Sequence, residues 1–239
     1  MTKKLISIFT FICLWSVLAL IVNNDIILPA PYAVLSRCSE LLLSASFYMS
    51  LLMTFLRAHI GFIISLISGI LVSYLCYIYK WLEDILSLWI KGLQTIPQIS
   101  FIIFLLFWID HEICVYVVVT LIGFPIVYFN MLESFKSIPQ EYKDILQLYD
   151  YNHSSLLINV YLPLCRSTLI STIKSALPLC LKVTVMSEVL LFTSVGLGND
   201  LSDARVNIDM IGVFAYTLLL IAAISIEMKL INKTYKTAN

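Results

Sequence analysis

The sequence predicts an all-α, polytopic membrane protein with about six transmembrane helices. Of its 239 residues, 60% are hydrophobic and 13% are charged. Soluble domains are about half apolar and about a quarter charged, so this chain carries more apolar surface than one globular core can bury. The apolar residues also gather in long runs that could each span a bilayer. The largest polar interruption between these runs is the segment 133–163.

The first apolar run extends from Leu5 to Val22 and is long enough to span. No small-residue cleavage site follows it, so we expect a retained helix rather than a signal peptide. The chain then leaves the membrane through Leu28-Pro29-Ala30-Pro31, where the prolines favour extended backbone. From Val34 to Arg57 the pattern is amphipathic, and we expect one or two helices that run along the outer surface into the bundle.

Three further spans precede the polar segment. We predict the second span from Ile60 to Tyr79, the third from Ile85 to Ile109 and the fourth from Ile113 to Leu132. Pro97 lies inside the third span and removes a helix hydrogen bond, so a kinked or broken helix is expected there.

Two spans follow the polar segment, from Thr168 to Phe192 and from Met210 to about Met228. Basic residues concentrate in loops on the cytoplasmic side of membrane proteins. With both chain ends inside, nine basic residues fall on the cytoplasmic side and only Arg37, Arg57 and Arg205 fall outside. We therefore expect cytoplasmic N- and C-termini and a cytoplasmic 133–163 segment. The nine are Lys3, Lys4, Lys80, Lys136, Lys143, Arg166, Lys229, Lys233 and Lys236.

The 133–163 segment predicts a pair of short helices. Gln140 to Tyr149 has an apolar stripe at helical spacing, and Asp150-Tyr151-Asn152 is a turn signal. Ser154 to Tyr161 is predicted as a second helix, which Leu162-Pro163 should stop. Such a pair could sit in a groove on a partner protein, or it could be a connector that rests on lipid headgroups. Composition alone leaves both interpretations open.

This segment resembles the "EAA" loop of binding-protein-dependent ABC transporter permeases. That pattern is an acidic residue, two small residues, three variable ones, a glycine and a later Leu-Pro pair. Here Asp144-Ile145-Leu146 takes the acidic triplet position, Asp150 takes the glycine position, and Leu162-Pro163 follows at the expected distance. The flanks are similar to the nitrate/sulfonate/taurine-type subgroup, in order and with similar spacing. They are Leu28-Pro29-Ala30-Pro31, Ile96-Pro97, Phe124-Pro125-Ile126 with Asn130, Ser137-Ile138-Pro139, Glu188, Gly196-Leu197-Gly198 and Asp203-Ala204-Arg205.

The resemblance implies a type I importer (MetI-like) permease in a bacterial inner membrane, with residues 1–239 forming one transmembrane domain. Two permease copies, expected as a homodimer, would form the pathway, and an extracytoplasmic binding protein would deliver a small solute such as a sulfonate, nitrate, taurine or a thiamine precursor. The chain itself would not be an enzyme and would bind no cofactor, because ATP would be hydrolysed by a cytoplasmic ABC ATPase. The resemblance places the ATPase contact at Asp144, Ile145, Leu146, Tyr149, Asp150, Leu162 and Pro163.

This copy departs from the family pattern in its loop. Ile145 and Leu146 replace small residues, and Asp150 replaces a glycine whose backbone favours positive φ. A divergent or inactive paralogue, acting as a heterodimer partner or membrane scaffold, is therefore the alternative function.

Two of the charged residues within the predicted fifth span, Lys182 and Glu188, are candidate functional residues. Lys182 lies about 21 Å along the helix, where a charge is costly and normally faces a bundle interior or water. It is a candidate pathway residue for an anionic substrate, or a lysine that snorkels or pairs structurally. Glu188 lies about 600° further around the helix, so the two do not share a face. Glu188 is a candidate for the pathway mouth or for bracing a neighbouring span.

Other function classes find little support in the sequence. The formal net charge is zero, whereas nucleic-acid binding needs a basic face. The six cysteines are dispersed, and the three histidines share no metal-ligand spacing. An intramembrane enzyme is a remote alternative, because no predicted span contains an internal histidine with an acidic neighbour. We also expect the chain to contact membrane lipids.

Overall fold

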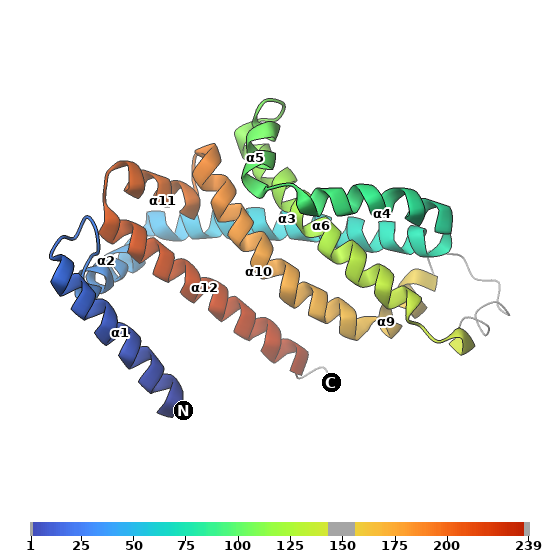
Figure 1. Ribbon diagram of the computed structural model, residues 1–239, viewed down its shortest axis with the longest axis horizontal. Helices are drawn as coiled ribbons and strands as arrows, with labels where there is room; N and C mark the ends of the chain where they lie inside the picture. The colour runs from blue at the N-terminus through green and yellow to red at the C-terminus, as the bar shows by residue number, and fades with distance from the viewer. Residues whose placement is uncertain (1, 143–155, 237–239) are drawn as a thin grey trace.

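The computed structural model describes residues 2–142 and 156–236, and all regular structure in these ranges is helical. Figure 1 shows long helices laid side by side, with α3 running along the longest axis of the molecule. The elements are α1 (Thr2–Val22), α2 (Pro31–Leu43), α3 (Ala45–Ile78), α4 (Lys80–Thr95), α5 (Gln98–Leu106), α6 (His111–Lys136), η1 (Leu157–Tyr161), α9 (Leu162–Leu164), α10 (Arg166–Leu191), α11 (Leu197–Val206) and α12 (Met210–Lys236).

Each predicted span corresponds to a helix or a bent helix pair. Within the described residues, four helices are individually long and apolar enough to cross a membrane, namely α3, α6, α10 and α12. The predicted third span is the pair α4 and α5, which meets the same criterion only when taken together. The predicted first span is α1, whose described apolar stretch, Phe9–Val22, is shorter than the other four. The chain is therefore an all-α polytopic membrane protein.

The third span is broken at Pro97, as its sequence predicted. Helix α4 ends at Thr95, helix α5 begins at Gln98, and their axes differ by 98°. Proline lacks the backbone N–H that would continue the helix, and the residue before it favours extended backbone. Ile96 is extended, with φ −71° and ψ 127°. Figure 1 shows α5 turned away from α4, which lies alongside α3.

The second span begins much earlier than predicted. We expected Val34 to Arg57 to lie on the outer surface and the span to start at Ile60, but α3 is one unbroken helix of 34 residues from Ala45. The break occurs at Ser44, whose backbone is extended, so α2 is a separate short helix. No proline occurs between Ala45 and Ile78 to interrupt the helix. Consequently Arg57, assigned to the outer surface from the sequence, is buried inside a spanning helix.

Helix α3 buries its small and polar side chains and exposes its apolar ones. The buried stripe recurs every three or four residues, which is one face of an α-helix. The opposite face carries exposed side chains such as Leu52, Leu56 and Ile63, which suit a lipid surrounding. The stripe consists of Ser50, Thr54, Arg57, Gly61, Ser65, Gly69 and Ser73.

Helices α3 and α6 pack closely because glycines stand at the contact. A Cβ atom at Gly61 would lie 2.7 Å from Val119 Cγ1, and one at Gly69 would lie 2.7 Å from Val127. Ser65 lies between the two glycines, and its hydroxyl donates to the backbone oxygen of Thr120 at 2.8 Å. Small residues at i, i+4 and i+8 are a common way for membrane helices to approach closely.

The base of the 133–163 loop is fixed to the bundle by Tyr161. Its ring lies 5.4 Å from the ring of Tyr74 on α3 and 6.0 Å from that of Phe135 on α6, measured between centroids. Leu162-Pro163 was expected to stop the preceding helix, and this is wrong. The helical backbone continues through Pro163, which stands at a helix start where its missing N–H costs little, and ends only at Leu164.

Candidate functional site

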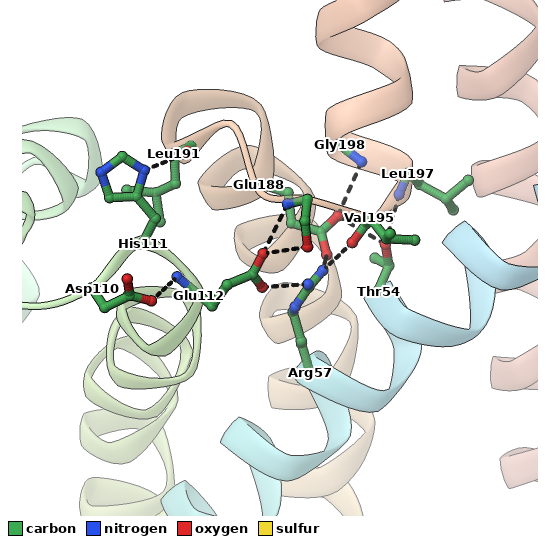
Figure 2. A network of polar contacts seen from close by, with 11 residues as sticks. Thr54, Arg57, Asp110, His111, Glu112, Glu188, Leu191, Val195, Leu197 and Gly198 are labelled. Carbon is green, nitrogen blue, oxygen red and sulfur yellow. Dashed lines mark hydrogen bonds and ion pairs between the residues drawn. The ribbon is translucent and has the colours of Figure 1, made fainter.

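A buried arginine joins three helices at one end of the bundle. Arg57 of α3 is 1% exposed. Its Nη1 donates to Glu188 Oε1 of α10 at 2.7 Å and to the backbone oxygen of Val195 at 2.6 Å. Its Nη2 donates to Glu112 Oε2 of α6 at 2.5 Å. Figure 2 shows these bonds converging on the guanidinium group. We call Arg57, Glu112 and Glu188 the Arg57 cluster.

Glu188 is fully buried, and both of its carboxylate oxygens have partners. While Oε1 accepts from Arg57, Oε2 accepts from the Thr54 hydroxyl at 2.8 Å and from the backbone N–H of Gly198 at 3.0 Å. The Thr54 hydroxyl in turn accepts from the N–H of Leu197 at 2.8 Å. The N–H of Gly198, in the first turn of α11, is thereby directed at an anion, as the partial positive charge of a helix start favours.

The two glycines of Gly196-Leu197-Gly198 leave room for the Glu188 side chain. A Cβ at Gly196 would lie 2.7 Å from the carboxyl carbon and both oxygens of Glu188. A Cβ at Gly198 would overlap Glu188 Cβ and would lie 2.5 Å from the backbone oxygen of Val185. Both positions therefore need glycine because of close approach. The sequence pattern identified the element and the acidic residue separately, and the structure brings them into contact.

Glu112 connects the cluster to the loop between α10 and α11. Its Oε1 accepts from both the backbone N–H and the hydroxyl of Ser194, each at 2.8 Å. Asp110 caps the start of α6 by accepting from the backbone N–H of Glu112 at 2.9 Å. This cap holds the Glu112 backbone in place and so positions its side chain. Unlike Arg57 and Glu188, Glu112 is 40% exposed. Its contacts are therefore the part of the cluster that solvent can reach.

The Arg57 cluster is suited to holding helices together rather than to catalysing a reaction. It contains one cation and two carboxylates, and buried charges of this kind persist only when they are paired and hydrogen-bonded. Within residues 2–142 and 156–236, no group of three or more His, Cys, Asp or Glu side chains is arranged to hold a metal ion. The arrangement ties α3, α6 and α10 together and fixes the start of α11.

The two candidate pathway residues of the predicted fifth span, Lys182 and Glu188, lie on different faces of α10, as their spacing implied. Glu188 is fully buried in the Arg57 cluster, whereas Lys182 is exposed. Two serines share the exposed face of Lys182. Ser171 and Ser175 are both exposed and stand 11 and 7 residues before it, which places all three within about 40° around the helix. The candidate pathway residues are thus separated by the structure.

Most of the predicted ATPase contact lies outside the described residues. Asp144, Ile145, Leu146, Tyr149 and Asp150 all fall there. The structure places the other two members of that set at the loop's return to the bundle, with Leu162 half-buried and Pro163 exposed.

The sequence missed Arg57 and Glu112 as site residues. Arg57 was placed on the surface because the span was drawn from Ile60, and Glu112 fell between the predicted third and fourth spans. One signal was present: Arg57 stands in an otherwise apolar stretch, and a charge there needs a partner. The sequence also showed no histidine beside an acid within a span, yet His59 of α3 and Glu227 of α12 form a pair with Nε2 and Oε1 2.7 Å apart. Their positions, 168 residues apart, hid this contact.

Comparison with known proteins decides the family. A family model described as "binding-protein-dependent transport system inner membrane component" matches residues 61–233, which extend from within α3 to near the end of α12. The chain belongs to this family. Its members are inner-membrane permeases of ABC importers, so the resemblance drawn from the loop and flanking motifs is confirmed.

Two curated relatives of this permease cover most of the chain. It is 24% identical over 205 residues to a Bacillus subtilis (strain 168) protein named as aliphatic sulfonates transport permease protein SsuC, spanning 85% of this chain and 74% of the relative. It is 25% identical over 209 residues to the formylaminopyrimidine transport permease protein ThiX of Halalkalibacterium halodurans, spanning 87% of this chain and 82% of the relative. The permease is thus similar to transporters named for two different small solutes.

Proposed function

We propose that this permease, paired with a second copy, forms the translocation pathway of an ABC importer for a small anionic solute. A cytoplasmic ABC ATPase would dock on the 133–163 loop, and an extracytoplasmic binding protein would deliver the solute. Both chain ends would lie in the cytoplasm. The observation that carries the proposal, beyond family membership, is the exposed Lys182 in the middle of a spanning helix.

Lys182 supports an anion pathway because a charge at this depth needs water or a partner. A lysine ammonium deep in hydrocarbon costs about 3 kcal/mol or more, and such residues face cavities or protein rather than lipid tails. The exposed serines on the same face of α10 add hydroxyl donors. A water-filled path between two copies of the chain would accommodate this face. The first relative is named for aliphatic sulfonates, which are anions, and the Lys182 charge is complementary to them.

Loop docking is supported by the way the loop joins the bundle. The two helices that flank it, α6 and α10, continue from the loop to the Arg57 cluster, where Glu112 and Glu188 both bind Arg57. At the loop end, the aromatic rings of Tyr161, Tyr74 and Phe135 hold its base against α3 and α6. A force applied to the loop would therefore reach the far end of the bundle through two helices of 26 residues each.

Uptake by reconstituted vesicles tests the pathway. The permease would be assembled with its ATPase and binding protein, and uptake of radiolabelled alkanesulfonate would be compared with uptake of formylaminopyrimidine. We expect Lys182→Ala to lower sulfonate uptake about tenfold or more and Lys182→Arg to retain most of it. Lys91→Ala, which removes another exposed lysine, is the matched control. Equal sulfonate uptake by wild type and Lys182→Ala would exclude the proposed role.

Co-purification tests the docking site separately. We expect Asp144→Arg or Leu146→Arg to release the ATPase while the permease still inserts into the membrane. If the ATPase stays bound to both variants, the loop is not the docking site. If the wild-type chain itself retains an ATPase but shows no ATP-dependent uptake of any tested solute, the alternative of an inactive paralogue is favoured. The substituted positions Ile145, Leu146 and Asp150 are the reason to keep that alternative in view.

A further inference from the structure

His59 and Glu227 form an isolated polar pair inside the membrane-spanning part of the chain. His59 lies in α3 and Glu227 in α12, both of which are long and apolar enough to span. The Nε2 atom of His59 is 2.7 Å from Oε1 of Glu227. The His59 side chain is 41% exposed and that of Glu227 is 15% exposed. The second oxygen of Glu227, Oε2, is buried without a hydrogen-bond partner among the described residues. The transport function proposed above uses neither residue.

The hydrogen bonds of the histidine ring determine where its protons are. Nδ1 of His59 lies 2.7 Å from the backbone oxygen of Phe55. A carbonyl oxygen can only accept, so Nδ1 carries a proton. A neutral imidazole has one N–H, which leaves Nε2 with a lone pair that faces a carboxylate oxygen. Two acceptors at 2.7 Å require one further proton between them, located on Nε2 or on Glu227.

We propose that His59 and Glu227 together bind one proton within the membrane and that this proton holds α12 against α3. With the proton bound, the pair has no net charge, whether it is imidazolium with carboxylate or imidazole with carboxylic acid. A neutral pair tolerates the apolar surroundings, which a lone carboxylate does not. The orphan Oε2 favours this form as well, because an unpaired carboxylate oxygen costs more in an apolar site than an unpaired carbonyl oxygen.

Loss of the proton would convert the contact from attraction to repulsion. A carboxylate would then face the Nε2 lone pair, and water would be needed to solvate it. Helix α12 is in a position to respond, since only 11% of its span is buried and it packs on α2, α11 and α10. We therefore expect α12 to separate from α3 at high pH. This separation would depend neither on the ATPase nor on the transported solute.

The charged neighbour of His59 is Glu227. On α3, Arg57 is bound to Glu112 and Glu188. On α10, which packs against both helices, Glu188 is in the same cluster, Lys182 is exposed, and Lys174 is half-buried with a contact of its own. On α12 itself, Lys229 and Lys233 are exposed. The ring of Phe55 stacks on that of His59, with centroids 6.0 Å apart, and Ile224 and Ile231 stand on the same face of α12 as Glu227, three positions before it and four after it.

Distance measurements between spin labels test the proposal. Labels at Leu71 of α3 and Lys233 of α12 are both on exposed positions, in a background where the exposed Cys13 is replaced by serine. The labelled chain would be diluted with unlabelled chain in lipid nanodiscs, so that distances within one chain are read. The pH would be raised from about 5 to about 10, a range that includes the ordinary histidine pKa of about 6.5.

Three variants make the outcome decisive. In the wild type we expect the α3–α12 distance to lengthen as pH rises. Glu227→Gln should keep the short distance at every pH, because its amide N–H donates to Nε2 and does not titrate. Glu227→Ala should show the long distance throughout, and Ser225→Ala, an exposed change on α12, should behave as wild type. A wild-type distance that does not change with pH, or a Glu227→Gln variant that changes as the wild type does, would overturn the proposal.

Discussion

The guanidinium of Arg57 and the carboxylate of Glu188 are 2.7 Å apart, and at most 1% of either side chain is exposed. Two ions removed from water in this way are costly, and only their mutual attraction with further hydrogen bonds offsets the cost. Here Thr54, Gly198 and Val195 supply those further bonds. The pair therefore depends on the whole arrangement around it, and α3 and α10 cannot separate without exposing a charge.

Removing one member of this pair should be strongly destabilising. We expect Glu188→Ala to lower the free energy of unfolding by about 3–5 kcal/mol, because Arg57 is left buried without its partner. Thermal unfolding in mild detergent would measure the loss. Glu40→Ala, which removes the partner of the exposed Arg37, is the control and should cost about 1 kcal/mol or less. Equal losses for the two variants would show that the buried pair is not a major contributor.

Two glycines should respond to alanine in opposite directions. At Gly198 an added Cβ would overlap Glu188 and the Val185 backbone, so Gly198→Ala should destabilise by about 1–3 kcal/mol. At Gly92 an added Cβ meets nothing within 4 Å, and the position lies in helix α4. Gly92→Ala should therefore stabilise by about 0.5–1 kcal/mol. The two melting temperatures, measured in one detergent, check both, and a stabilising Gly198→Ala would contradict the packing described here.

Asp200 of α11 should make stability depend on pH. Burial away from water, with a smaller effect of the nearby Asp203 charge, raises the pKa of Asp200 above its ordinary value of 3.8. The folded state thus favours the protonated acid. Below the unfolded pKa this costs nothing, and the cost of folding a charged Asp200 develops as pH rises from the unfolded pKa to the folded pKa and is constant above it.

Asp200→Asn should remove that cost. We expect the variant to melt above the wild type at pH 7, and the difference to shrink as the pH falls toward about 4. The amide keeps an acceptor for the hydrogen bond from Ser50. Asp25→Asn, at an exposed aspartate, is the control and should show no such pattern. An Asp200→Asn advantage that is the same at both pH values would contradict the assigned cause.

Tyr161 should transmit force rather than bind the ATPase. Tyr161→Ala removes the ring that contacts Tyr74, Tyr77 and Phe135 at the loop base. We expect ATPase binding to persist but solute uptake per ATP hydrolysed to fall about threefold or more. Tyr161→Phe keeps the ring and should retain coupling. Parallel assays of ATP hydrolysis and uptake in vesicles would separate the two effects, and loss of ATPase binding in Tyr161→Ala would contradict this assignment.

The sequence predicted the spans well because their signal is local. Runs of apolar residues and the break at Pro97 depend on neighbours a few positions away. It failed where the deciding contact was distant. The start of α3 at Ala45 was missed because Arg57 was placed on the surface and the span was drawn from Ile60, which left out His59. The partners of Arg57, Glu112 and Glu188, are 55 and 131 positions away, and the partner of His59, Glu227, is 168 positions away. An unpaired charge in an apolar run indicates that a partner exists but does not say which residue it is.

The close contact of α3 with α6 limits how this membrane protein can change shape. At Gly61 and Gly69 the facing valines of α6 occupy the space where side chains would otherwise stand. Helices packed this closely cannot slide past each other, so α3 and α6 would move together as one rigid unit. Rearrangement would then fall to the loosely attached periphery, namely α12 and the hinge between α4 and α5. A larger residue in place of Gly61 or Gly69 would push α3 and α6 apart. The two helices could then move separately, which would change which parts of the protein move.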